Sequence, residues 1–156
     1  MKKVALIGLL LFIIGCQSKK KVTEVTPKKP SVEKLALAEV STLQKSRSYE
    51  LGKRVLQTCN TSKFKPFTTE EATPEIIQKM TRDKISLTCQ NILRGFGQFN
   101  DMKLMEVYRI EKENVTVFRY QCDYEKKYKI KELRVTINDK NKITAITTKD
   151  WSDDFK

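Results

Sequence analysis

The spacing of apolar residues changes once along this chain, and that change limits the folds it can adopt. Between about residue 35 and residue 95 they recur every three or four positions, as on one face of a helix. From residue 104 onward they alternate with polar residues, as in strands with one buried face. Helices followed by strands predict an α+β domain, with the helices on one side of the sheet.

Two helices are expected in the first half. Residues 32–59 lack proline and have an apolar stripe, made of Ala36, Val40, Leu43, Leu51 and Val55. A second helix should begin at Thr73-Pro74-Glu75, because threonine can cap, proline suits the first helical position, and an acid follows in the first turn. Its buried stripe should include Met80, Leu87 and Ile92, and its end should lie at Gly95-Phe96-Gly97.

Four strands are expected in the second half, at residues 104–111, 115–124, 128–137 and 143–148, with polar turns at 112–114 and 139–141. Residues 115–124 alternate most clearly: Phe118, Tyr120, Cys122 and Tyr124 share one face. The predicted architecture is therefore two N-terminal helices packed on a four-stranded antiparallel sheet.

The start of the chain has the pattern of an export signal. Lys2 and Lys3 precede an apolar run over residues 4–14, too short for the roughly 20 residues that span a bilayer. The run ends in Ile13-Ile14-Gly15-Cys16, which resembles the lipobox of bacterial lipoproteins. That resemblance implies a signal peptide over residues 1–15 and a mature chain that begins at Cys16, which carries fatty-acyl chains such as palmitate.

Residues 16–31 are expected to be a lipidated, flexible tether. They hold Pro27, Pro30 and five lysines without apolar periodicity, so they cannot bury enough surface to fold. The lysines either attract anionic lipid headgroups or simply keep a spacer solvated. The resemblance places the protein on the exported side of the cell membrane or outer membrane, attached to membrane lipid through Cys16. Gln17, where an Asp would favour inner-membrane retention, favours the outer membrane.

Residues 32–156 form the predicted domain. The order Thr73-Pro74-Glu75, helix, Gly95-Phe96-Gly97-Gln98-Phe99, then strands with a turn before Ile143 resembles small nuclear-transport-factor-2-like domains. These domains, also called cystatin-like, recur in bacterial lipoproteins of unknown function. The resemblance implies a curled sheet wrapped around helices, often with a cone-shaped pocket, and it transfers no catalytic residues.

Three thiols remain once Cys16 is lipidated. In an exported protein they predict one disulfide and one odd cysteine. Cys59 ends the first predicted helix and Cys89 lies inside the second, so packing of these helices would bring the two together. Cys59–Cys89 is the preferred pair, and the two pairings with Cys122 stay open.

The chain contains no histidine, which excludes His-based triads and His-ligated zinc. The cysteine spacing does not suit a metal site, and no metal, cofactor or catalytic residue is predicted. The candidate binding residues are Tyr108, Tyr120 and Tyr124. A nearby Asp123 or Glu106 could act as a base, but alternation turns Asp123 away from Tyr120 and Tyr124, so packing is the simpler interpretation.

A net charge of +12 raises the question of a polyanionic partner. The basic run between Lys126 and Arg134 is interrupted by Glu132, and an exported, tethered protein rarely meets nucleic acid, so no nucleic-acid partner is expected. We interpret the run as a solvated edge strand, with an anionic envelope component as the alternative. Trp151 either closes the core, which is the preferred interpretation, or anchors a partner.

The predicted function is a noncatalytic binding or interaction module of the cell envelope, whose protein partner the sequence does not identify. One alternative is a small-ligand carrier that uses a cavity between sheet and helices. The other is a cavity enzyme of the isomerase or dehydratase kind. A pocket with convergent polar groups would favour either alternative, whereas a filled core with an exposed patch would favour interaction.

Overall fold

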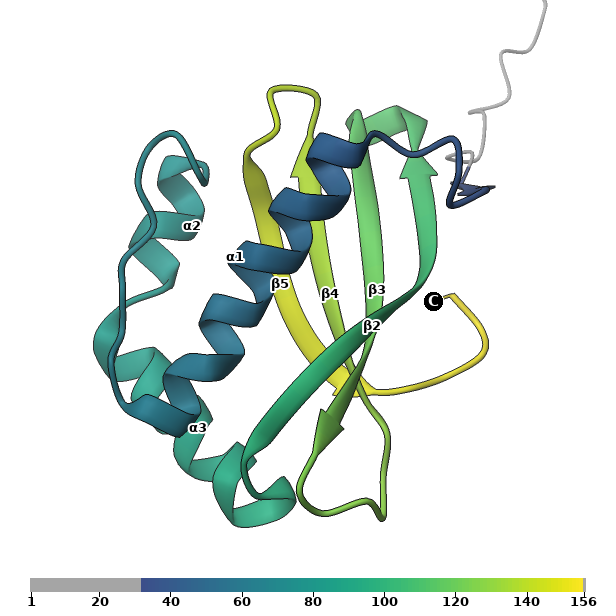
Figure 1. Ribbon diagram of the computed structural model, residues 1–156. Coiled ribbons are helices and arrows are strands. Elements are labelled where there is room, and N and C mark those ends of the chain that lie inside the picture. Colours follow the sequence, from purple (N-terminus) through teal and green to yellow (C-terminus); the bar gives the residue numbers. More distant parts are fainter. Residues whose placement is uncertain (1–31, 156) are drawn as a thin grey trace, which may run out of the picture.

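In the computed structural model, which describes residues 32–155, helices lie on one face of a five-stranded antiparallel sheet (Figure 1). Helix α1 crosses that face, and α2 and α3 lie beside it. The elements in chain order are β1 (Val32–Leu35), α1 (Thr42–Thr61), α2 (Pro74–Lys79), α3 (Arg82–Phe96), β2 (Phe99–Ile110), the 3-10 turn η1 (Glu111–Glu113), β3 (Val115–Tyr124), β4 (Lys131–Asn138) and β5 (Ile143–Asp150). The α+β class is therefore as predicted.

The sheet has five strands rather than the predicted four, and it is open rather than strongly curled. Its order is β1-β2-β3-β4-β5, and every neighbouring pair is antiparallel. The extra strand is β1, which pairs with the end of β2 from Val32↔Ile110 to Leu35↔Val107. This pairing joins segments more than seventy residues apart, so local spacing could not reveal it.

The first helix is shorter than predicted, because residues 32–41 form β1 and a turn. Helix α1 begins after Ser41 and ends before Ser62, which adopts the left-handed conformation at φ 56°. Leu51 is buried as expected, but Leu43, expected in the stripe, is 60% exposed. Leu43 lies in the first turn of α1, and its side chain faces solvent.

The second predicted helix is two helices with a break at Met80 and Thr81. Met80 leaves the helical conformation at ψ 67°, and the Thr81 side chain accepts a hydrogen bond from the Lys84 amide to start α3. The break shifts the phase of the buried stripe, so Leu87 is exposed while Cys89 is buried. The predicted start at Pro74 and the end at Gly97, with φ +74°, are confirmed.

The core lies between the sheet and the helices α1, α2 and α3. Gly52 of α1 comes so close to β4 that a Cβ atom there would lie 2.8 Å from Leu133 Cδ2 and 3.0 Å from Val135 Cγ2. On β3, Phe118 and Tyr120 are at most 1% exposed. Because side chains alternate along a strand, the neighbours of these core residues point to the opposite, open face of the sheet.

The basic run does not form an edge strand, contrary to expectation. Its strand portion belongs to β4, which pairs with β3 on one side and β5 on the other, so β1 and β5 are the edges. Lys126, Lys127 and Lys129 lie in the connection before β4. The predicted signal peptide, Cys16 and the tether lie outside the described residues. None of the helices within 32–155 has the length and apolar character needed to cross a membrane.

Candidate functional site

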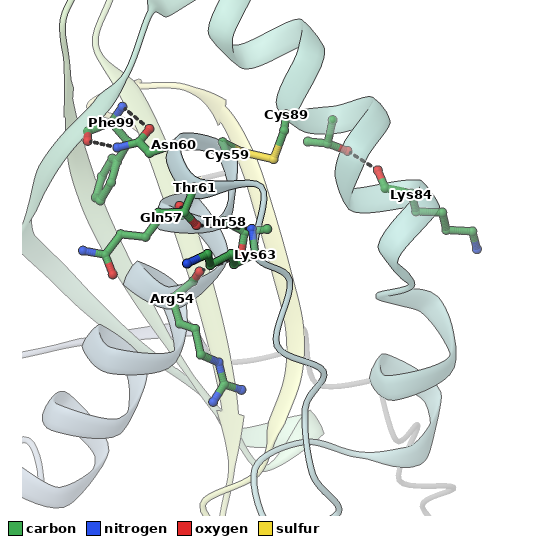
Figure 2. Close-up of a disulfide and its surroundings, with 11 residues drawn as sticks. Arg54, Gln57, Thr58, Cys59, Asn60, Thr61, Lys63, Lys84, Cys89 and Phe99 are labelled. Atoms are coloured by element: carbon green, nitrogen blue, oxygen red, sulfur yellow. Dashed lines mark hydrogen bonds between the residues drawn. A yellow bond between two sulfur atoms is a disulfide. The ribbon is translucent and has the colours of Figure 1, made fainter.

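A disulfide joins Cys59, near the end of α1, to Cys89 in α3, with the two Cα atoms 4.7 Å apart (Figure 2). This is the pairing preferred from the sequence, and among residues 32–155 the remaining cysteine, Cys122, is a free thiol buried in β3. Burial raises the pKa of the Cys122 thiol to about 12, so it stays protonated at neutral pH. In the chain-entropy model, a bridge across 30 residues stabilises the fold by about 3–4 kcal/mol.

The end of α1 is also bound to the start of β2. Asn60 Nδ2 donates to the carbonyl of Phe99 at 2.6 Å, and the Phe99 amide donates back to Asn60 Oδ1 at 3.0 Å (Figure 2). This pair of hydrogen bonds and the disulfide hold α1, α3 and β2 together, which indicates a structural role for this corner.

The three candidate tyrosines lie in two different places. Tyr120 and Tyr124 are 1% and 3% exposed on the helix side of β3, and burial raises the pKa of both phenols. The Tyr120 hydroxyl lies 2.6 Å from Ser48 Oγ of α1. Tyr108 of β2 instead lies on the open face, since it pairs with Val117, which alternates with Phe118. The structure therefore separates Tyr108 from the other two.

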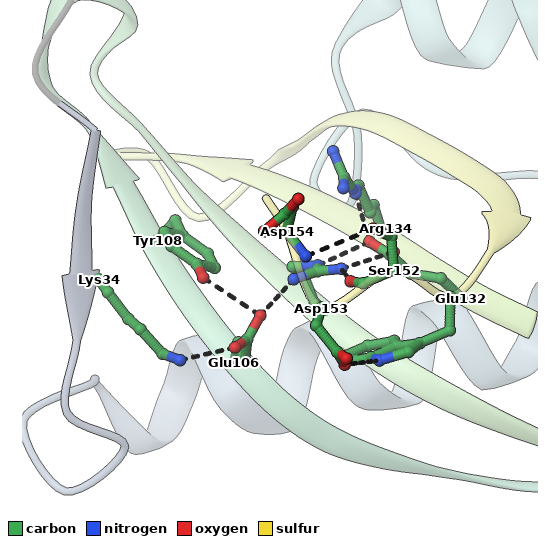
Figure 3. Close-up of polar contacts among 10 residues, drawn as sticks. Lys34, Glu106, Tyr108, Glu132, Arg134, Ser152, Asp153 and Asp154 are labelled. Carbon is green, nitrogen blue, oxygen red and sulfur yellow. Dashed lines mark hydrogen bonds and ion pairs between the residues drawn. The ribbon is translucent and has the colours of Figure 1, made fainter. Parts of the chain in front are cut away.

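The open face carries a cluster of charged side chains from four strands, shown in part in Figure 3. We call it the charged cluster; its members are Lys34 of β1, Glu106 of β2, Arg119 of β3, and Glu132 and Arg134 of β4. Cross-strand register aligns them, because Glu106 pairs with Arg119 and Arg119 pairs with Arg134. Directly opposed residues of adjacent strands share a face, so the five side chains meet.

Arg119 is the centre of the charged cluster. It donates from Nε and Nη2 to the two oxygens of Glu132, at 2.8 and 2.9 Å, and both side chains are fully buried. Its Nη1 donates to Glu106, while Glu132 also accepts from Arg134. Such a two-pronged, charge-assisted pair is the arrangement that makes a buried guanidinium tolerable.

The carboxylates of the charged cluster stay ionised. Desolvation pushes the pKa of Glu132 upward, but hydrogen bonds from Arg119 and Arg134 outweigh it, and the net pKa is lowered. For Glu106, desolvation is likewise outweighed, mainly by the hydrogen bond from Lys34 and the charge of Arg119. The hydrogen bond to Glu132 raises the pKa of Arg119 further. Glu106 and Glu132 are thus held in their charged form by the cations beside them.

The C-terminal tail, residues 151–155, covers the charged cluster. The Trp151 ring lies 4.4 Å from the guanidinium carbon of Arg119, and Arg119 Nη2 donates to the carbonyl of Ser152 at 2.6 Å. Phe155 stacks on Tyr108 with ring centres 4.0 Å apart, and it lies 4.8 Å from the guanidinium of Arg134. Figure 1 shows the chain end beside β2, although the tail leaves the sheet from β5.

A groove of about 340 Å³ lies on the same sheet, at residues of β2 and β3. It is lined by Asp101, Met102, Lys103, Gln121, Cys122, Asp123 and Ile130. Lys103 and Gln121 pair across β2 and β3, on the open face with Arg119. The open face therefore combines fixed charge, aromatic rings and a hollow.

Around the charged cluster, the sequence predicts only Tyr108 as a binding residue. It favours packing for Glu106 and core closure for Trp151, and it does not predict Arg119, Glu132 or Arg134 as site residues. The signal available for Arg119 was its place on the outward face of the alternating strand 115–124. A charged side chain at such a position normally lies in water. Arg119 is buried because the tail, which follows the edge strand β5, covers it.

Among residues 32–155, no group of three or more His, Cys, Asp or Glu side chains is placed to hold a metal ion. In comparisons with known proteins, no family model, no curated protein and no solved structure matches this chain.

Proposed function

We propose that this chain is a bacterial envelope lipoprotein whose domain is a noncatalytic interaction module, with the open face of the sheet as its contact surface. One observation carries the proposal: the helix side of the sheet is filled with packed core, whereas the open face gathers charge and aromatic rings beneath a five-residue tail. Residues 32–156 hold 24 basic and 18 acidic residues, a net charge of +6, which favours an acidic partner such as an anionic envelope component.

The filled interior favours interaction over the two cavity-based alternatives. A carrier or a cavity enzyme needs space between sheet and helices, and the central part of that space is occupied by side chains. Tyr120 bonds to Ser48, its ring lies 6.2 Å from that of Tyr49, and Leu133 and Val135 press against Gly52. Their mutual packing explains these residues without a ligand.

Membrane attachment in this proposal rests on the sequence motif at residues 13–16. We also propose that the domain is related to nuclear-transport-factor-2-like domains. The order of elements, with helices before an antiparallel sheet, supports this relationship. The open sheet and the extra strand β1 are not explained by it.

The anchor is tested by metabolic labelling with a palmitate analogue, followed by mass spectrometry of the mature N-terminus. The wild-type chain should carry label, begin at Cys16 and sediment with membranes, because two or more acyl chains hold a protein stably at a bilayer. Cys16→Ala should lose the label, whereas Cys122→Ala, which alters a buried thiol, should keep it. Label that persists in Cys16→Ala would remove the lipoprotein half of the proposal.

The contact surface is tested by a photo-crosslinking amino acid placed on either side of the sheet. Lys103 and Thr147 are exposed, and their pairing with Gln121 and Arg134 places them on the open face. Leu87, 63% exposed on α3, is the matched control on the helix side. Adducts in whole cells should form from the two open-face positions and not from Leu87. Equal yields from all three positions would contradict the assigned surface.

A further inference from the structure

We infer that the open face is a peptide-binding cradle and that the C-terminal tail is its intramolecular occupant. The cradle consists of Tyr108, Arg119 and Arg134, held in place by Glu106 and Glu132. This inference rests on the proposed function and names its partner class: a short acidic segment with two aromatic residues four positions apart. The tail, Trp-Ser-Asp-Asp-Phe, has this chemistry itself.

The tail is bound mainly by side chains, as a docked peptide would be. The Trp151 amide still continues the ladder by donating to the carbonyl of Ile130 at 2.9 Å. Beyond it the chain leaves β5 and turns, with Trp151 Nε1 donating to Asp153 Oδ1 at 3.0 Å. Trp151 and Phe155 then provide the two rings that contact the cradle, and the carbonyl of Ser152 accepts from Arg119 between them.

The residues of the cradle all come from the sheet, and contacts within the sheet hold them. Glu132 of β4 holds Arg119 by two hydrogen bonds, and Glu106 of β2 holds it from the other side. The Tyr108 hydroxyl donates to Glu106 at 3.2 Å, which orients the ring on which Phe155 stacks. A guanidinium fixed in this way offers its flat face to an aromatic ring, and such preorganisation lowers the entropy lost on binding.

The tail can also leave. Ser152, Asp153 and Asp154 are exposed, and Trp151 and Phe155 are half-buried. A short exposed segment opens with a smaller free energy than the whole domain. While it is docked, it competes with any free peptide at an effective concentration in the millimolar range, so it restrains binding. A partner with the same chemistry displaces it by mass action.

The charges of the tail and of the domain indicate that the partner is acidic. Asp153 and Asp154 lie in the sequence between the two rings of the tail, which contact Arg119 and Arg134, and residues 32–156 hold 24 basic and 18 acidic residues, a net charge of +6. Opposite charges of this kind speed association and help to select a partner.

The experiment measures binding of a fluorescein-labelled hexapeptide, WSDDFK, to purified full-length chain in detergent by fluorescence anisotropy. The closed wild-type chain is compared with a variant carrying Trp151→Ala and Phe155→Ala, in which the tail is released. The released variant should bind the peptide saturably and at least about tenfold more tightly than the wild type, because the competing tail is gone. A control peptide, ASDDAK, which lacks both rings, should not bind.

A released variant that keeps its circular dichroism and its Cys59–Cys89 bridge, yet binds WSDDFK no better than ASDDAK, overturns the inference. If that variant unfolds, the wild-type chain supplies the decision through hydrogen exchange. Millimolar WSDDFK should then speed amide exchange in residues 152–155 and ASDDAK should not; unchanged exchange overturns the inference equally. Neither readout depends on acylation of Cys16, so failure of the peptide assay and failure of palmitate labelling are separate results.

Discussion

At the scale of single residues, buried charge is the most unusual feature of this domain. Arg119 and Glu132 are both fully buried, a state that Arg and Glu rarely adopt without a partner. Each compensates the other, and Glu106, Arg134 and the Ser152 carbonyl complete the hydrogen bonding. A pair of this kind adds little net stability, but removal of one member leaves a buried charge, which costs about 3–5 kcal/mol. The pair is therefore better explained by the surface that it organises than by stability.

A second ion pair makes stability depend on pH. Glu71 accepts from Arg54 of α1 at 2.7 and 2.8 Å, and from the Thr68 amide at 3.0 Å. The hydrogen bonds from Arg54, with a smaller contribution from Thr68, lower the pKa of Glu71 from 4.5 to about 2. A carboxylate whose pKa is lower in the folded state stabilises the fold above its unfolded pKa. That contribution is lost as the pH falls from about 5 to 2.

We expect Glu71→Gln to lower the free energy of unfolding at pH 7 and to have little effect at pH 2. At pH 2 the carboxyl of Glu71 is about half protonated in the folded state, and most of the stability that its lowered pKa supplies has been lost. Urea denaturation followed by circular dichroism at pH 7, 4 and 2 measures this convergence. The matched control is Glu70→Gln, a change at the exposed neighbouring position. A stability difference that stays the same size down to pH 2 would show that the effect of the substitution is not electrostatic.

At the scale of elements, the contact between α1 and β4 depends on the absence of a side chain at Gly52. An alanine Cβ there would meet Leu133 Cδ2 at 2.8 Å and Val135 Cγ2 at 3.0 Å. Overpacking of this kind costs about 1–3 kcal/mol. The gain in helix propensity from Gly to Ala is at most about 1 kcal/mol, so the clash should prevail. We expect Gly52→Ala to destabilise the domain.

Gly95 of α3 is the matched control, because a Cβ there meets nothing closer than Tyr128 Oη at 3.8 Å. Gly95→Ala should therefore raise the melting temperature while Gly52→Ala lowers it, as measured by thermal unfolding of the two variants side by side. Two variants of equal stability would mean that α1 can shift away from β4 without loss, contrary to the tight contact described above.

At the scale of the whole molecule, the sheet has a stable centre and two weakly held segments. β3 and β4 have a hydrogen-bonded neighbour on both sides, whereas β1 has four residues, one neighbour and mostly exposed side chains. The C-terminal tail is likewise exposed along most of its length. Both weakly held segments contact the charged cluster, β1 through the hydrogen bond from Lys34 to Glu106 and the tail through Arg119.

We expect hydrogen exchange of the full-length chain to be slowest in β3 and β4 and at least about a hundredfold faster in β1 and the tail, because short exposed segments open without global unfolding. Exchange followed by mass spectrometry of peptides resolves these segments, and α1 serves as an internal reference for the core. Protection of β1 equal to that of β3 would show that the edge opens only with the whole domain.

The amino-acid sequence by itself determined the α+β class, the strand at 115–124 with its buried face, the helix start at Pro74 and end at Gly97, and the preferred pairing of Cys59 with Cys89. Each of these depends on local periodicity, on the chemistry of one cap, or on the few ways to pair three thiols. Tertiary structure alone decided that residues 32–35 form a strand and that Arg119 is buried. Both outcomes depend on contacts between segments far apart in the chain. Strand β1 forms only by pairing with β2, and Arg119 on the open face is buried only when the C-terminal tail covers it.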